Sequence, residues 1–294
     1  MRKQYLIKRD QQLWLIRNYQ RLGGRACADY LHTPIKIVNK FAASRHLRIN
    51  PVIRSQNCSR RNRIIWQQKR ADRIVAAGNL RITNKQQTYV LGFLWGDGYL
   101  HHTNGSSTYY PIIEIVQPDL VAIKPTLKVL GNWHISHRPA SYKVGVRRKR
   151  QGTATLYDPV IGQFLVDNDY RDKSHTTPSK ILARIPAKIH NYFWRGYIDA
   201  DGCFYRHGIQ CLRQFSLAGS YNQDWTAFIM LLKALGITRY KVSRRIVGKH
   251  KTRGSIVVIA NKADIYRLGK YLYGDRYDSL GLKRKYLKYL STQT

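Results

Sequence analysis

Carboxylates are the scarcest charged groups in this chain. Its 294 residues hold 52 Lys and Arg but only 16 acidic residues, and a single one of these, Glu114, is a glutamate. The formal net charge of +36 predicts a polyanionic partner. Charge leaves the activity open, because passive RNA-binding proteins share it. An Asp within an apolar segment therefore needs a specific reason.

Cysteines and long apolar runs are also lacking. The four cysteines show no C-x2-C spacing: Cys27, Cys58, Cys203 and Cys211. This argues against a zinc site and is typical of a reduced, intracellular protein. No run of about 18 apolar residues appears, and the N-terminus has no signal-peptide core. We therefore expect no membrane association, and a cytoplasmic location at a nucleoid, in a phage-infected cell or in an organelle.

Two segments about 104 residues apart carry the same pattern: YVLGFLWGDGY at Tyr89–Tyr99 and FWRGYIDADGC at Phe193–Cys203. Each places a carboxylate, Asp97 or Asp201, at the polar end of an apolar helix. Small residues recur four positions apart in both, namely Gly92 and Gly96, and Gly196 and Ala200. This spacing leaves one helix face bare. Two such helices can pack backbone to backbone and bring the two carboxylates together.

The electrostatics of these two positions favour a metal site. An Asp at a helix C-terminus faces the negative end of the helix dipole, which costs up to ~1 kcal/mol, and a bound cation would reverse that sign. The alternative is that Asp-Gly simply ends each helix, with Gly as a left-handed C-cap. Repetition at domain-scale separation favours the metal site.

These segments resemble the LAGLIDADG motif, and the chain resembles single-chain homing endonucleases with two motif copies. The second copy is close to the consensus, whereas the first has Trp95 where the family commonly has an acidic residue. The resemblance implies Asp97 and Asp201 as catalytic metal ligands, backbone carbonyls of Gly96 and Ala200 as further ligands, and Asp199 as a packing or capping residue. It also implies two or three Mg²⁺ ions shared between Asp97 and Asp201, with Mn²⁺ or Ca²⁺ as substitutes in vitro.

The resemblance points to further residues near each scissile phosphate. Family members place a Lys after the last helix of each repeat, which implies Lys173 in the first repeat and Lys285 or Lys283 in the second. Gln117 and Ser220, just before the middle helices, are candidates for positioning water. The alternative for each lysine is an ordinary phosphate contact, because the chain has 52 basic residues.

The order of predicted elements repeats from Thr88 onward. The first motif helix is followed by a strand at 110–116, a helix at 118–130, strands at 133–136 and 142–148, and a helix at 159–166. The second is followed by strands at 209–217, 238–247 and 255–259 and helices at 223–235 and 263–272. The predicted fold class is α+β: two pseudo-symmetric αββαββα repeats, residues 88–186 and 187–294, forming a DNA-binding saddle.

A small all-α domain is predicted at residues 1–50, followed by a basic linker at 51–87. Helical spacing, a break at Gly23-Gly24 and a helix from Pro34 to Arg45 resemble a helix-turn-helix. Its candidate DNA contacts are Lys36, Asn39, Lys40 and Ser44, and those of the linker are Arg60, Arg61 and Arg63. The alternatives are a plain structural cap and a solvated linker.

Period-two alternation places basic side chains on one face of two predicted strands. Lys143 and Arg147 alternate with apolar residues in the first repeat, as do Arg239, Lys241, Ser243 and Arg245 in the second. Such a face suits the major groove, although exposed strands are also basic for solubility alone. Together with the repeated Asp and the basic strands, the resemblance to LAGLIDADG endonucleases implies a monomeric, Mg²⁺-dependent endonuclease that cuts both strands of double-stranded DNA. An RNA maturase that binds structured intron RNA is the alternative.

Overall fold

The computed structural model describes residues 7–102, 108–139, 142–143, 146–147, 150–207, 212–247 and 252–294. The chain divides into two compact units, Met1–Asp72 and Arg73–Thr294, each with a hydrophobic core of its own. In the described ranges no helix combines the length and apolarity needed to cross a membrane.

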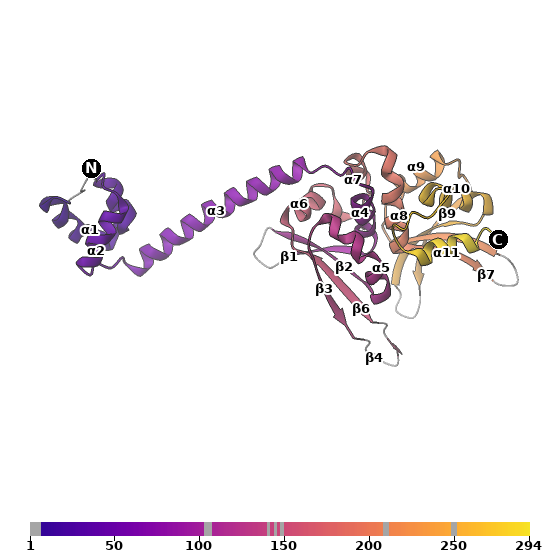
Figure 1. The fold of residues 1–294 in the computed structure, drawn as a ribbon, viewed down its shortest axis with the longest axis horizontal. Helices are drawn as coiled ribbons and strands as arrows, with labels where there is room; N and C mark the ends of the chain where they lie inside the picture. The colour runs from indigo at the N-terminus through magenta and orange to yellow at the C-terminus, as the bar shows by residue number, and fades with distance from the viewer. Residues whose placement is uncertain are drawn as a thin grey trace. The chain divides into compact units, whose positions relative to one another are not determined.

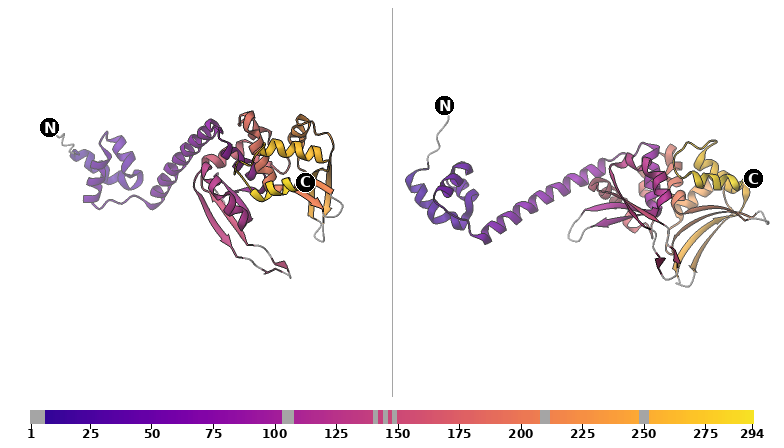
Figure 2. Two further views of the ribbon diagram at one scale, coloured as in Figure 1. Left: turned by 45° about the vertical axis from the view of Figure 1, so that its right-hand side comes forward. Right: turned by 60° about the horizontal axis from the view of Figure 1, so that its bottom comes forward.

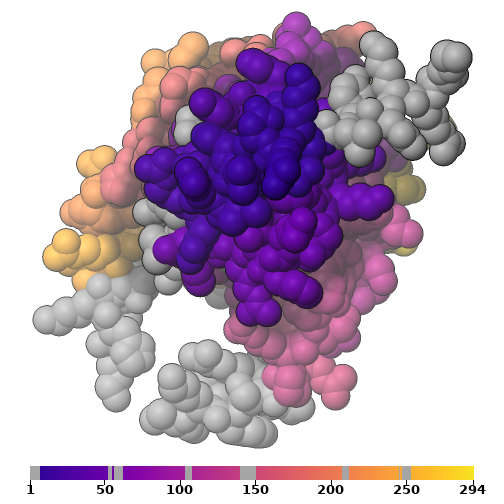
Figure 3. Space-filling view, turned by 90° about the vertical axis from the view of Figure 1, so that its left-hand side faces the viewer, coloured from indigo at the N-terminus to yellow at the C-terminus, as the bar shows by residue number. Residues whose placement is uncertain are grey.

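The N-terminal unit is helical. It holds α1 (Arg9–Tyr30), α2 (Ile35–Ser44) and the start of α3 (Pro51–Asn79), and the indigo atoms of Figure 3 show one face of it. Gly23 adopts a left-handed φ of 79° and breaks α1 into two helical pieces, because glycine tolerates positive φ at little cost. Leu15, Val38 and Ala42 are buried where α1 and α2 pack together. The predicted helices and the Gly23-Gly24 break are thus present.

Residues 51–79 form one helix where the sequence suggested a linker. The charged side chains of α3 give little amphipathic pattern, which is why its helical state was not evident. Its C-terminal end and the segment that follows belong to the core of the second unit, where Ala77 is 2% exposed and Ile82 is 1% exposed. That unit therefore begins before the first motif helix.

The first repeat of the second unit contains a four-stranded antiparallel sheet with the order β1-β2-β6-β3. Its elements are α4 (Lys85–Asp97), β1 (Gly98–His102), β2 (Tyr109–Val116), α5 (Gln117–Leu127), η1 (Lys128–Leu130), β3 (Trp133–Arg138), β4 (Tyr142–Lys143), β5 (Val146–Arg147), β6 (Gln151–Leu156) and α6 (Pro159–Asp167). The strands β4 and β5 pair with each other as a short hairpin. Short elements follow: η2 (Tyr170–Asp172), α7 (Ser179–Ala183) and η3 (Ala187–Ile189).

The second repeat has the same connectivity. Its elements are α8 (His190–Asp201), β7 (Gly202–His207), β8 (Leu212–Ser220), α9 (Thr226–Ala234), β9 (Tyr240–Val247), β10 (Thr252–Ile259) and α10 (Lys262–Tyr273), and α11 (Lys283–Ser291) ends the chain. The sheet order β7-β8-β10-β9 places first, second, fourth and third strands side by side, as in the first repeat. The predicted α+β class and the αββαββα order are confirmed.

Helices α4 and α8 lie side by side between the two sheets, and helices cover one face of each sheet (Figures 1 and 2). The first motif helix packs on β1 and β2, and the second packs on β7 and β8. Both helices are buried along most of their length because their apolar residues face the sheets as well as each other. The pair therefore forms the centre of the core.

Candidate active site

The bare stripes of α4 and α8 touch backbone to backbone. A β-carbon added to Gly92 would lie 1.9 Å from the carbonyl oxygen of Phe193, and one added to Gly196 would lie 2.1 Å from that of Tyr89. Near the helix ends, a β-carbon on Gly96 would lie 2.4 Å from the Ala200 β-carbon. The repeated small residues thus bring the helices together, as their spacing predicted.

Asp97 and Asp201 are the last residues of these two helices and lie next to each other. A β-carbon on Gly96, the neighbour of Asp97, would lie 3.0 Å from an oxygen of Asp201. The glycines that follow, Gly98 and Gly202, are extended, with φ of −90° and −84°, and open strands β1 and β7. The left-handed C-cap alternative is therefore wrong, and glycine is needed at Gly98 because a β-carbon would meet the Leu94 carbonyl at 2.7 Å.

Both carboxylates are half-buried and electrostatically coupled. Burial raises the pKa of Asp97 above its usual value, while Lys173 and Lys285 lower it. Burial, followed by the charge of Asp97, raises the pKa of Asp201 to about 7, against the opposing effect of the same two lysines. A carboxylate pair that resists ionisation in this way gains from any cation placed between its members.

Lys173 closes the end of the first motif helix. Its ammonium donates to the backbone carbonyls of Trp95 at 2.8 Å, Gly96 at 2.6 Å and Gly98 at 2.5 Å. These carbonyls carry the negative end of the helix dipole. Burial lowers the pKa of Lys173 to about 8, although Asp201 and Asp97 act in the opposite direction. A lysine of this kind stays charged at neutral pH and can release a proton slightly above it.

Lys285 occupies the matching position at the end of the second motif helix. It is 6% exposed, donates to the carbonyl of Gly202 and has a pKa that burial lowers. Gly98 and Gly202 each follow the carboxylate of their own motif, so the two lysines donate to equivalent carbonyls. Lys283, the other candidate, is exposed at the first position of α11. Of the two alternatives, the structure brings only Lys285 to the carboxylate pair.

The donor set fits a hard divalent cation. Within the described ranges, neither Asp97 nor Asp201 accepts a hydrogen bond or ion pair, and no group of three or more His, Cys, Asp and Glu that could hold a metal ion occurs there. Two such carboxylates suit Mg²⁺, which keeps waters and accepts phosphate oxygens. The Gly96 carbonyl oxygen already accepts a hydrogen bond from Lys173. As a metal ligand it would use its second lone pair for the cation. Ala200, the other residue predicted to offer a carbonyl ligand, directly precedes Asp201 in α8.

Asp199 has a structural environment. It is 1% exposed, and its Oδ2 accepts from the Tyr89 hydroxyl and from the Leu282 backbone N–H, each at 2.8 Å. Burial raises its pKa to about 6. The neighbouring Arg195, also buried, donates to Asp278 at 2.7 Å. These contacts hold the segment that leads into Lys285.

Gln117 and Ser220, the candidates for positioning water, lie at the start of α5 and at the end of β8. Ser220 ends β8, and its hydroxyl donates to the Ser174 carbonyl, next to Lys173. Gln117 is the first residue of α5, and its backbone N–H donates to the Arg150 carbonyl at 3.0 Å. Ser220 thus adjoins the site by holding the lysine segment.

The second sheet presents Lys241 and Ser243 on the face opposite its core. Lys241 pairs with Val258 and Ser243 with Ile256, whereas the alternate residue Val257 is buried. The predicted apolar face of this strand is only partly covered, because β9 lies at the sheet edge and leaves Val242 41% exposed. The single strand predicted at 142–148 is wrong, because Lys143 and Arg147 belong to two paired strands, β4 and β5, in which Arg147 lies opposite Tyr142 and Lys143 opposite Val146. The side chains of Lys143, Arg147 and Arg245 lie outside the described part.

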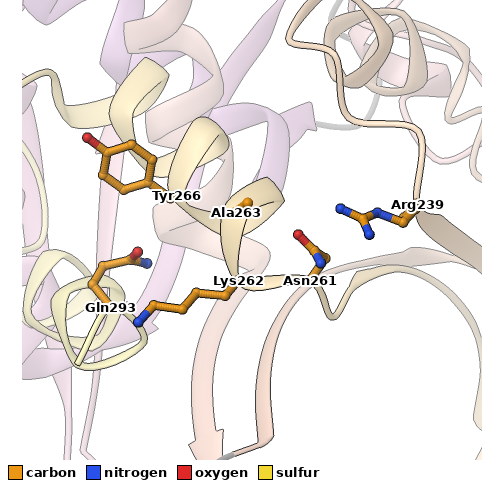
Figure 4. A pocket seen from close by; sticks show the side chains of 6 residues that line it. All are labelled: Arg239, Asn261, Lys262, Ala263, Tyr266 and Gln293. Atoms are coloured by element: carbon orange, nitrogen blue, oxygen red, sulfur yellow. The ribbon is translucent and has the colours of Figure 1, made fainter.

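Arg239 does not share that face. It precedes β9 and pairs with Asp264 at 3.3 Å near the start of α10. Figure 4 shows it across a pocket of about 520 Å³ from side chains of Asn261, Lys262 and Tyr266. The period-two prediction failed for Arg239 because the strand predicted at 238–247 begins two residues later, at Tyr240, and leaves Arg239 outside it.

The N-terminal candidates are mostly solvent-exposed. Lys36 and Lys40 lie four positions apart on α2 and are exposed. Asn39 is exposed too, but its Oδ1 accepts from Tyr19 at 3.3 Å, and the Ser44 hydroxyl donates to its own helix at Phe41. On α3, Arg63 is exposed, and the side chains of Arg60 and Arg61 lie outside the described part.

Three residues at the site were not singled out from the sequence: Asp119, Gln223 and Arg284. Arg284 Nε donates to Asp119 at 2.6 Å, and the Gln223 amide donates to the Lys173 carbonyl at 2.9 Å. Asp119 and Gln223 are 104 positions apart, like the motif carboxylates. That spacing was the available signal.

No protein-family model and no curated protein matches the chain. Its fold is similar to that of the homing endonuclease I-WcaI bound to its DNA recognition sequence, with 14% identity and a TM-score of 0.46 over 72% of this chain and 90% of that one. For the LAGLIDADG meganuclease I-AabMI bound to uncleaved DNA the values are 13%, 0.42, 71% and 90%. For a variant of I-DmoI with its target DNA and Mg they are 13%, 0.37, 62% and 92%. Among these neighbours, I-WcaI is a homing endonuclease and I-AabMI a LAGLIDADG meganuclease.

Proposed function

We propose that this chain is a site-specific DNA endonuclease that cuts both strands of a long target with the help of Mg²⁺ held by Asp97 and Asp201. The observation that carries the proposal is the convergence of four groups: two helix-terminal carboxylates that are unpaired within the described residues, and two lysines, the half-buried Lys173 and the buried Lys285, on equivalent carbonyls. One carboxylate and one lysine would form a half-site for the cleavage of each DNA strand.

The aspartates and the lysines would have different roles in phosphodiester hydrolysis. Asp97 and Asp201 would hold the metal, which when bound supplies an activated water and neutralises charge on the phosphate. Lys173 and Lys285 keep the ends of α4 and α8 in place and present a positive charge beside each carboxylate. That charge would stabilise the phosphate as it becomes more negative.

The surface around the site supports duplex DNA as the substrate. The chain carries +36 of formal charge, and Lys241 lies on the open face of the second sheet. Positive charge of this size gives affinity through phosphate contacts, and groove-facing strand residues give specificity. Within the N-terminal unit, Lys36 and Lys40 on α2 would extend the target on one side.

Incubation of the full chain with a randomised duplex DNA library and Mg²⁺, followed by sequencing of the cut ends, tests this function. We expect cleavage at one recurring site, and Asp97→Asn or Asp201→Asn should each abolish it while keeping affinity within about tenfold, or 1.4 kcal/mol. Normal cutting by either variant would remove the assigned active site. A wild-type chain that binds structured RNA and cuts no DNA would support the maturase alternative.

A further inference from the structure

The chain segment that carries each lysine of the site contacts the opposite repeat. Arg284, next to Lys285 on α11 of the second repeat, forms a two-pronged ion pair with Asp119 on α5 of the first repeat, with Nε to Oδ1 at 2.6 Å. Gln223, before α9 of the second repeat, donates to the carbonyls of Lys173 at 2.9 Å and Thr176 at 3.0 Å in the first. The contacts cross between repeats in both directions.

The positions of the two contacts are equivalent. Asp119 and Gln223 are separated by the same 104 residues as Asp97 and Asp201, and each is buried, at 8% and 7% exposure. A buried polar side chain needs its partners, because leaving it unpaired is costly. Each contact therefore resists displacement of the chain segment it grips.

The two contacts differ in chemistry. The Asp119 contact is a bidentate Arg–carboxylate pair, which fixes geometry as well as distance. The Gln223 contact is neutral and is supported by the Ser220 hydroxyl, which donates to Ser174. Ser220 is itself held by Ser255, whose hydroxyl donates to the Ser220 carbonyl at 2.6 Å.

We infer that Asp119 and Gln223 are positioning residues that place Lys285 and Lys173, respectively, so that each repeat sets the lysine of the other half-site. The inference rests on the proposed endonuclease function for its consequence in cleavage. The positioning of the two lysines can be tested in the protein without DNA. Because the two contacts are separate, loss of one should disturb one lysine and leave the other in place.

Acetic anhydride labelling of the full chain at pH 8, read by mass spectrometry, tests the structural part without DNA. We expect Asp119→Asn to raise the labelling rate of Lys285 by about tenfold, equivalent to 1.4 kcal/mol, and to leave Lys173 unchanged. Gln223→Met should do the reverse. Arg284→Gln, whose side chain is 48% exposed, gives the same test as Asp119→Asn if that variant does not fold. Asp275→Asn, which removes an 87% exposed carboxylate from a surface ion pair, should alter neither rate.

Strand-specific cleavage at a site cut by the wild type tests the consequence. Asp119→Asn should slow the cut of one strand and Gln223→Met that of the other, so that opposite nicked intermediates accumulate. Equal changes at both lysines in both variants, or none, would overturn the inference. A wild type that cuts no DNA but shows the expected labelling would overturn the proposed function and leave the positioning role standing.

Discussion

The backbone contact between α4 and α8 makes a sharp prediction for Gly92→Ala. The added β-carbon would lie 1.9 Å from the Phe193 carbonyl oxygen, and real contacts essentially never fall below 3.0 Å, so the helices must move apart by more than 1 Å. No side chain can turn aside, because the clash is with the main chain. We expect the substitution to lower the free energy of unfolding by about 3 kcal/mol or more, which is the upper end of the range for overpacked cores.

Gly78→Ala is the matched control. A β-carbon at Gly78, in α3, meets nothing within 4 Å, so alanine should add about 0.4–1 kcal/mol of stability by restricting the unfolded chain. Urea unfolding followed by circular dichroism compares the two variants with the wild type. A loss of 3 kcal/mol would lower the melting temperature by about 6–12 °C in a unit of this size. Equal unfolding midpoints for Gly92→Ala and Gly78→Ala would refute the backbone contact.

Three further predictions concern the site and its partner. The pKa of Asp201 in the folded state is raised to about 7 from 3.8. Between about pH 4 and pH 7 the folded state therefore holds a proton that the unfolded chain has released, and the free energy of unfolding should fall as the pH rises. Without metal at pH 8, Asp201→Asn should melt at a higher temperature than the wild type, and an equal pH response of the two proteins would contradict this. DNA affinity should fall with salt at a slope steeper than about −5 in log K against log salt, since each phosphate contact contributes about −0.9; a slope shallower than about −3 would place most of the charge away from DNA. Residues 1–72 hold 17 basic and 3 acidic residues, and their deletion should weaken DNA binding about tenfold. It should also shorten the protected DNA footprint on one side without moving the cut. An unchanged footprint would make that unit a structural cap.

The helices of the core were predictable, and several strands were not. The motif helices, α5, α6, α9 and α10 follow helical spacing or helix-start residues. Strand β6, QGTATL, was missed because it has no apolar alternation. It lies in the middle of its sheet, and its small residues reflect close packing, since a β-carbon on Gly152 would lie 2.4 Å from Leu120 of α5.

Strands β1 and β7 were missed for a different reason. Each begins at the glycine directly after a motif carboxylate, so the sequence reads as one continuous motif. The change from helix to strand needs no turn residue in the left-handed region, because Gly98 and Gly202 are extended. Local propensity gives no sign of such a junction.

The site was predictable where it depends on one repeat and hidden where it depends on two. Asp97 and Asp201 stand out as carboxylates in apolar segments, and Lys173 follows the last helix of its repeat. The Asp119 pair with Arg284 spans 165 positions, and no local pattern connects them. Only the shared repeat spacing of Asp119 and Gln223 marked that position, and it becomes informative once the lysine segments are known to cross between repeats.

The arrangement at the ends of α4 and α8 gives the strongest argument for a bound cation. Two helix C-termini and two carboxylates meet in one half-buried place, and each of these features disfavours the others. Lys173 and Lys285 offset part of this by donating to backbone carbonyls, Gly98 and Gly202 among them, and leave the carboxylates themselves unpaired within the described chain. The charges of Lys173 and Lys285 lower the pKa values of both carboxylates, but burial acts in the opposite direction and dominates. Burial, followed by the charge of Asp97, raises the pKa of Asp201 to about 7, so a further positive charge beside it would favour its ionised form. A divalent cation would supply that charge, and its binding should therefore stabilise the protein more at pH 8 than at pH 6.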